Sequence, residues 1–246
     1  TTRDRINAIA GHGAEVIQLD LDYEETCRYA FEMSNKMNWK LLQDASWDGY
    51  EEIPAYIMSG YLTHLIEMQD SINVINTPNI DVVFLQAGVG SWPAACIWYY
   101  INRYKINKPK IVLVEPENSS GILQSLSSGK RITPIGSFDT IMAGLNCGIP
   151  SKSGWNIIKN GCDASLTISD EYAKKSMRAL FYPINNDKKI ISGESGAAGL
   201  GGLLKLIEDD KYSKFREHIG LNSKSRVLVF NTEGNTDKKN FNSIIN

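Results

Sequence analysis

The sequence predicts an α/β fold built around a parallel sheet. Strand-like and helix-like stretches alternate along its 246 residues, as in chains made of βα units. Three of the strand-like stretches, VVFLQ, KIVLV and RVLVF, are apolar at nearly every position rather than at every second one. Strands with this pattern are typically buried on both faces, which requires helices on both sides of the sheet.

The N-terminal third predicts short alternating elements. They are a helix over 5–10 that stops at Gly13, a strand over 15–19, a helix over 22–36, a strand over 39–43 and a helix over 55–73. Asp22 and Glu25 have the spacing of a capping box, which defines the start of the second helix. Later come strands over 82–86, 110–114, 165–168 and 226–230, with helices over 94–104, from Asp170 and over 196–207.

Composition and charge exclude several classes of protein. The 26 basic and 28 acidic residues give a formal net charge of -2, which indicates no attraction to nucleic acid or to an anionic membrane. No apolar stretch is long enough to span a membrane, and no signal peptide is recognisable. The four cysteines are scattered without a C-x-x-C pair. This usage indicates reduced thiols in the cytoplasm rather than a disulfide framework or a metal site.

The stretch AGVGSWPAA, which follows the strand over 82–86, is the first candidate binding site, because ligands of such folds bind beyond the carboxyl ends of the strands. Gly88 and Gly90 allow a sharp turn, and the start of the next helix favours an anion such as phosphate. A plain strand-to-helix turn also explains the glycines and is the commoner case for an isolated Gly-x-Gly. Glu115 could bind the ribose of a dinucleotide. However, Pro93 occupies the position of the third glycine in the dinucleotide-binding motif G-x-G-x-x-G, which argues against such a site.

Two carboxylates stand at predicted strand ends. Asp44 follows the strand over 39–43 in the segment QDASWDGYEEIP, where burial would adapt a carboxylate to act as a general base. Glu194 lies in the glycine-flanked turn SGESG, a position suited to an oriented carboxylate. The alternatives are a helix cap or acidic loop for Asp44 and close helix packing for the glycine-rich segment.

The last predicted strand ends in NTEGNTD. The hydroxyl of Thr232 could bind a ring nitrogen or cap a turn, and turn formation is the default for this composition. His64 and Glu67 are three residues apart on one helical face, which indicates a surface pair, since two groups do not make a metal site. No G-x-S-x-G elbow supports a hydrolase.

Taken together, these stretches resemble the diaminopropionate ammonia-lyase family, pyridoxal-phosphate enzymes of fold type II, the tryptophan synthase β-like fold. The resemblance covers nearly the whole chain and rests on RDRINAI, DYEET, QDASWDGYEEIPAYIMSGY, FLQAGVGS, VEPE, DTIMAGLNCG, ISGESGAAGLG and NTEGNTD. It implies the C-terminal half of a small α/β domain over residues 1–45 and a large cofactor-binding domain over 46–246.

The resemblance also implies roles for the candidate residues. The loop that would hold the 5'-phosphate of pyridoxal phosphate comprises Gly88, Val89, Gly90 and Ser91. Thr232 would bind the pyridine nitrogen, and Glu194 would shape the site near the cofactor ring. Asp44 matches the carboxylate that takes the Cα proton of one substrate enantiomer.

The implied reaction is the α,β-elimination of 2,3-diaminopropionate to pyruvate and ammonia, carried out by a homodimer in amino-acid catabolism. Two alternatives stay open. One is another fold-type-II β-eliminase acting on serine or threonine, and the other is a non-catalytic half-protein that keeps the phosphate loop.

Two departures from the family pattern bear on activity. The phosphate loop continues with Trp92 and Pro93 where the family has small residues and glycines. Trp92 is expected to narrow the pocket or alter selectivity, and Pro93 suits the first turn of a helix. The family's Schiff-base lysine lies upstream of anything that matches Thr1. We therefore expect the chain to be the C-terminal portion of a longer or split enzyme, inactive without a polypeptide that carries the lysine.

Overall fold

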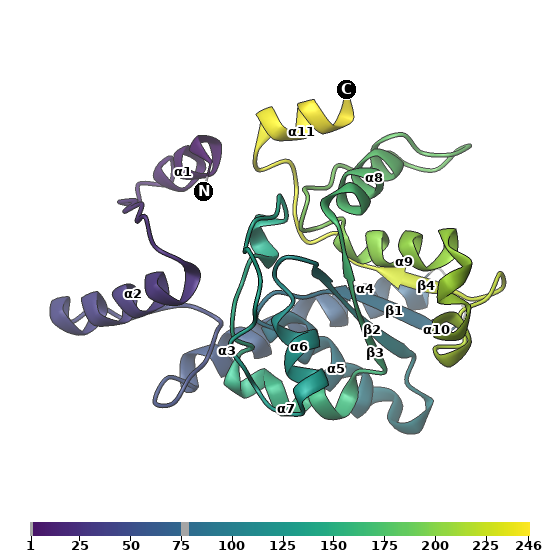
Figure 1. The fold of residues 1–246 in the computed structure, drawn as a ribbon, viewed down its shortest axis with the longest axis horizontal. Helices are drawn as coiled ribbons and strands as arrows, with labels where there is room; N and C mark the ends of the chain where they lie inside the picture. The colour runs from purple at the N-terminus through teal and green to yellow at the C-terminus, as the bar shows by residue number, and fades with distance from the viewer. Residues whose placement is uncertain (1, 75–78) are drawn as a thin grey trace.

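The computed structural model describes residues 2–74 and 79–246, and its centre is a parallel four-stranded sheet (Figure 1). The strands are β1 (Val82–Gln86), β2 (Lys110–Pro116), β3 (Ala164–Ile168) and β4 (Val227–Val229), in the order β3-β2-β1-β4. Phe84 at the middle of β1 lies opposite Val112 of β2 and Val229 of β4. All four predicted sheet strands are therefore confirmed, with shifts of one or two residues at some ends.

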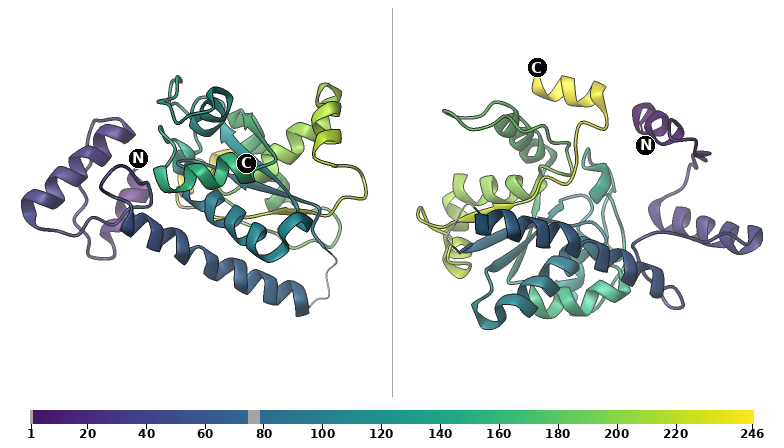
Figure 2. Two further views of the ribbon diagram at one scale, coloured as in Figure 1. Left: turned by 90° about the horizontal axis from the view of Figure 1, so that it is seen from below. Right: turned by 180° about the vertical axis from the view of Figure 1, so that it is seen from behind.

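Helices cover both faces of the sheet, as the apolar strands predict (Figures 1 and 2). One face packs on α5 (Ser91–Tyr104), α6 (Gly121–Ser128) and α7 (Lys152–Gly161). The other packs on α8 (Asp170–Phe181), α9 (Ala198–Glu208) and α10 (Ser213–His218). Val83 and Leu85 point into the first core and Val82 and Phe84 into the second, so side chains alternate between two buried layers.

Helices α1 (Arg3–Ala10) and α2 (Tyr23–Met37) lie to one side of this core (Figure 1). They are followed by α3 (Glu52–Gly60) and α4 (Leu62–Val74), which pack on α5, and Leu65 of α4 belongs to the first core. The predicted capping box is confirmed, because the Asp22 side chain accepts the Glu25 backbone N–H at 2.7 Å and the Glu25 side chain accepts the Asp22 backbone N–H.

Three predictions for this region are wrong. The segments 15–19 and 39–43 are irregular rather than strands, and no neighbouring strand lies beside them among the described residues. A strand needs a partner that accepts and donates its ladder hydrogen bonds, and local sequence cannot supply one. The single helix expected over 55–73 is two helices that meet at Tyr61.

The C-terminal segment returns to the second face. Helix α11 (Lys238–Ile245) packs Phe241, Ile244 and Ile245 against Met177 and Phe181 of α8. Short 3₁₀ turns occur at Lys105–Asn107, Ala143–Leu145 and Asp210–Tyr212. The sequence patterns do not indicate helices α6, α7, α10 and α11. None of the helices in the described ranges is both long and apolar enough to cross a bilayer.

Glu115 lies inside the fold and not at a ligand site. Its side chain is fully buried at the end of β2 and accepts the backbone N–H groups of Ile122 and Leu123, both at 2.8 Å. The carboxyl group thus caps the first turn of α6. Burial raises the pKa of Glu115 to about 8, and the two N–H donors only partly oppose this shift.

We expect this carboxyl to make the protein less stable as pH rises. Its folded pKa of about 8 exceeds the ordinary pKa of a glutamate, 4.5, so the folded state holds the proton more tightly between these values. The resulting contribution to stability is complete below pH 4.5 and is lost as pH rises through 8. Urea unfolding at pH 6, 7 and 8.5 should show that Glu115→Gln flattens this decline. The same substitution at the exposed Glu217 should not, and equal slopes for both variants would contradict the assignment.

Candidate active site

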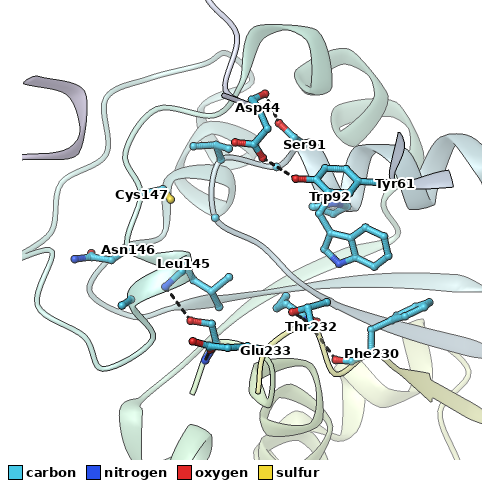
Figure 3. Close-up of a pocket in the computed structure, with 18 of the residues that line it drawn as sticks. Asp44, Tyr61, Ser91, Trp92, Leu145, Asn146, Cys147, Phe230, Thr232 and Glu233 are labelled. Carbon is cyan, nitrogen blue, oxygen red and sulfur yellow. Dashed lines mark hydrogen bonds between the residues drawn. The ribbon is translucent and has the colours of Figure 1, made fainter. Parts of the chain in front are cut away.

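A cavity of about 850 Å³ opens at the carboxyl ends of β1 and β4 (Figure 3). From β1 the chain passes to β2 on one side, while β4 lies on the other side of β1. The cavity thus occupies a topological switch point, where ligands of open α/β sheets bind. Its walls comprise the loop after β1, the loop after β4, the segment 143–147, the α3–α4 junction, and side chains from α2 and the turn before α9.

The loop after β1 has the shape of an anion site. Gly90 has a φ of 96°, and a Cβ atom there would lie 2.6 Å from Ile158 Cδ1. A Cβ atom at Gly88 would lie 3.0 Å from Cys147 Sγ. Helix α5 begins at Ser91, and the N–H groups of its first turn lack intrahelical acceptors. Gly88, Val89, Gly90 and Ser91 line the cavity, so the start of α5, which favours an anion, lies at its wall.

Asp44 lines this cavity although no strand precedes it. The buried Ser91 hydroxyl donates to the Asp44 carbonyl oxygen at 2.8 Å, so the Asp44 segment is attached directly to the phosphate-type loop. Two residues on, Ser46 is also buried, and its backbone N–H donates to Ser151 Oγ at 2.9 Å. Its hydroxyl accepts the Ser153 N–H at 2.7 Å. Hydrogen bonds to α5 and α7 thus fix a segment without regular structure.

Tyr61 contacts the Asp44 carboxylate from the α3–α4 junction. Its hydroxyl donates to Asp44 Oδ2 at 3.3 Å (Figure 3). Burial raises the pKa of Tyr61 to about 12, and the neighbouring carboxylate adds to the shift. The hydroxyl therefore keeps its proton, and remains a donor, throughout the neutral range.

The hydroxyl of Thr232 faces the cavity with its proton available. Gln86 Nε2 donates to Thr232 Oγ1 at 2.6 Å and to the Phe230 carbonyl at 3.1 Å. A carbonyl only accepts, so the Phe230 contact determines which end of the Gln86 amide is the nitrogen. Because Thr232 accepts from Gln86, its own proton is free to bind an acceptor in the cavity.

Glu194 lies behind the cavity wall and Glu233 lies on it. Glu194 is nearly fully buried, its Oε2 is 3.4 Å from Arg5 Nη2, and its Oε1 accepts from the Asn240 side chain. Glu233 accepts the Ser195 backbone N–H at 2.9 Å and lies 3.3 Å from Arg5 Nη2. One arginine from α1 therefore offsets the charge of both carboxylates. Sequence reasoning missed Arg5 and Glu233, although both belong to segments that it singled out.

An aromatic wall, comprising Tyr61, His64, Trp92 and Phe230, lines the β4 side of the cavity. The ring of His64 lies 4.4 Å from that of Trp92 between centroids, so the prediction of a surface pair with Glu67 is wrong. Burial lowers the pKa of His64, which leaves the imidazole neutral at pH 7. Trp92 Nε1 is buried and has no hydrogen-bond partner in the described part of the chain.

The charges of the cavity are carboxylates and backbone dipoles. Asp44 and Glu233 are its acidic residues, and no lysine or arginine is among the described residues that line it. Within the same part of the chain, no group of three His, Cys, Asp or Glu side chains is arranged to hold a metal ion. Asp44 forms no ion pair there, so it is the carboxylate available to a ligand.

Comparison with known proteins agrees with this geometry. Diaminopropionate ammonia-lyase of Escherichia coli (strain K12) is 35% identical to this chain over 245 residues, and that of Salmonella typhimurium (strain LT2) is 36% identical over 244 residues. These alignments cover 100% and 98% of this chain, but only 61% and 60% of the two relatives. The chain therefore spans about three fifths of the length of these relatives.

A crystal structure of the Escherichia coli enzyme, in complex with an aminoacrylate-PLP azomethine reaction intermediate, matches this fold with a TM-score of 0.91 at 35% identity. The match covers 99% of this chain and 62% of that chain. The predicted fold type II is thus confirmed. Residues 1–229, which include the glycine loop and most of the cavity, match the family described as pyridoxal-phosphate dependent enzyme. The chain belongs to the pyridoxal-phosphate-dependent enzyme family.

Proposed function

We propose that this protein forms the greater part of a diaminopropionate ammonia-lyase, which converts 2,3-diaminopropionate and water to pyruvate and two molecules of ammonia. The observation that carries the proposal is the Asp44 carboxylate, held beside an anion-binding loop in a cavity that no described lysine or arginine lines. Such a cavity favours a substrate with an additional ammonium group.

We also propose that the chain divides into a portion of the small domain over 1–45 and the large domain over 46–246.

The residues of the cavity fit pyridoxal phosphate. Gly88, Val89, Gly90 and Ser91 would bind the phosphate through backbone N–H groups, since the Ser91 hydroxyl already donates to Asp44. The free proton of Thr232 would bind the pyridine nitrogen. Glu194 would support the ring side of the site through Arg5 and Asn240. When bound, the cofactor supplies an electron sink that stabilises negative charge on the substrate Cα.

Asp44 is the proposed general base. Its carboxylate borders the cavity, and no lysine or arginine among the described lining residues competes for it, so it can accept the Cα proton from the face that it lines. A base on one face of the substrate acts on one enantiomer only. The imidazole of His64 is neutral and the hydroxyl of Tyr61 keeps its proton, so neither side chain brings a positive charge to the cavity.

The proposal also requires a lysine that this chain does not place in the cavity. No lysine lines the described cavity, and the chain spans about three fifths of its relatives. We infer that another part of a longer or split polypeptide supplies this group. The family resemblance further suggests a cytoplasmic homodimer that acts in amino-acid catabolism.

Mass spectrometry under denaturing conditions, after borohydride reduction of the protein with bound cofactor, tests the source of the lysine. We expect the cofactor adduct on a lysine outside the 246 residues, on the same polypeptide or on a companion. An adduct on any lysine of this chain would contradict the assignment.

Pyruvate release from serine in clear preference to diaminopropionate would instead favour a serine or threonine eliminase.

Asp44→Asn should lower kcat/KM for one enantiomer of diaminopropionate by about 100-fold or more, because the amide cannot accept the proton. The other enantiomer and the affinity for pyridoxal phosphate should change little. Pyruvate formation from each enantiomer, measured separately, gives the result. Asp48→Asn in the same segment is the matched control, since Asp48 is exposed and bonded to Lys152. Equal effects on both enantiomers would rule out the proposed role.

Gly90→Ala should weaken cofactor binding and the fold together. The added Cβ meets Ile158 and the φ of 96° is strained for alanine, so we expect a loss of about 1–3 kcal/mol in stability. Cofactor affinity, measured by absorbance titration, should fall about tenfold or more. Gly60→Ala in α3 is the control, because a Cβ there meets no atom within 4 Å. Unchanged affinity in Gly90→Ala would show that this loop does not hold the cofactor.

A further inference from the structure

Gln86 is a buried polar side chain at the point where β1 reaches the cavity. It is the last residue of β1, is 2% exposed, and belongs to the cavity wall. Side chains alternate along a strand, so Gln86 lies on the same face as Val82 and Phe84, which belong to the second core. An amide in this apolar row has lost its contact with water and requires hydrogen bonds within the protein.

Both hydrogen bonds of the Gln86 amide nitrogen reach the loop after β4. Nε2 donates to the Phe230 carbonyl at 3.1 Å and to the hydroxyl oxygen of Thr232 at 2.6 Å. The backbone pairing of β1 and β4 extends as far as Phe84 and Val229. The side chain therefore joins the two segments just beyond their last paired residues, and its nitrogen is fixed between a carbonyl and a hydroxyl.

The amide oxygen of Gln86 has no hydrogen-bond partner among the described residues. It faces α9, where a Cβ atom at Gly199 would lie 3.2 Å from Oε1. A buried amide oxygen without a partner is unfavourable, so other contacts must hold the amide in this orientation. A reversed amide would point its oxygen at the Phe230 carbonyl, and two acceptors repel each other. The amide nitrogen therefore stays on Thr232 although the oxygen is left unpaired.

This contact restricts how the Thr232 hydroxyl can act. A hydroxyl has one proton and two lone pairs, and Gln86 Nε2 occupies one of the lone pairs. No other described side chain hydrogen-bonds this hydroxyl. Its proton cannot lie on the side from which Gln86 donates, so the hydroxyl meets the cavity as a donor. A pyridine nitrogen accepts such a hydrogen bond only while it carries no proton of its own.

We propose that Gln86 is a positioning residue, which turns the Thr232 hydroxyl so that it donates to the pyridine nitrogen of pyridoxal phosphate and holds this nitrogen unprotonated. The inference rests on the proposed function, in which Thr232 is the partner of that nitrogen. Hydrogen bonds to the ring nitrogen tune the electronics of the cofactor. Gln86 thus acts on the cofactor through Thr232.

A cofactor analogue without the ring nitrogen tests this role. 1-Deaza-pyridoxal 5'-phosphate has a C–H group in place of that nitrogen and keeps the aldehyde and the phosphate. We would free the complete enzyme of cofactor, titrate it with each compound, follow binding by absorbance, and compare the two dissociation constants. Their ratio measures recognition of the ring nitrogen. A general loss of stability or of phosphate binding leaves this ratio unchanged.

The variants separate the amide from the hydroxyl. Gln86→Met keeps the length of the side chain and removes its amide, while Thr232→Val removes the hydroxyl. Gln124→Met is the matched control, because Gln124 also donates to a hydroxyl and a carbonyl but does not line the cavity. Its partners are Ser120 at 3.1 Å and Ile135 at 2.8 Å. Gln86→Asn, whose shorter amide cannot keep both contacts, replaces the methionine variant if that variant does not fold.

We expect the wild-type enzyme to bind the deaza compound about tenfold more weakly than pyridoxal phosphate, because the analogue leaves the hydroxyl proton without its acceptor. In Thr232→Val the donor is absent, and in Gln86→Met the hydroxyl is free to turn away. In both variants the two dissociation constants should differ by less than about threefold. Gln124→Met should keep the wild-type ratio.

The outcomes distinguish the inference from the proposed function. If Gln86→Met keeps the wild-type ratio, whether or not both affinities fall, its role is purely structural and the inference is wrong while the function stands. Equal affinity of the wild-type enzyme for both compounds would show that Thr232 does not bind the ring nitrogen, and the inference would fall with that assignment. Failure of the wild-type enzyme to bind pyridoxal phosphate would refute the proposed function itself.

Discussion

Strand β1 is paired on both edges and covered on both faces, and this complete burial determines where the cavity lies. All five residues of Val82–Gln86 are buried between β2 and β4. Backbone groups in such a strand must be satisfied by neighbouring strands, so the chain can turn only at its ends. At the carboxyl end it passes through Gly88 and Gly90 into the buried start of α5. The loop, the cavity and the contact from Ser91 to Asp44 all follow from this exit.

The central part of the fold is predictable because its signals are local. Apolar runs define the four strands, and the Asp22–Glu25 capping box defines the start of α2. The segments 15–19 and 39–43 look like strands for the same local reason but lack partners among the described strands. Pairing is a property of two segments, and single-sequence patterns describe one at a time.

For the site, the sequence indicates which loops matter but not what their side chains do. The glycine loop and Thr232 border one cavity, as expected for residues that follow neighbouring parallel strands. Asp44 borders it too, although it follows no strand and is held there by its hydrogen bond from Ser91. Tyr61 and His64 join them because α3 and α4 break at Tyr61 and pack on α5. Their roles depend on contacts between separate elements, and no spacing rule encodes such contacts.

The contacts of Arg5 have a consequence for how the protein is made. Arg5 meets Glu194 and Glu233, which follow it by 189 and 228 residues in the chain. Helix α1 buries none of its own residues, so it gains little from packing before those partners exist. During synthesis, the arginine has left the ribosome long before Glu233 has been added. The carboxylates beside the cavity are therefore neutralised only after nearly all of this chain has been translated, and the site matures as a late event of folding.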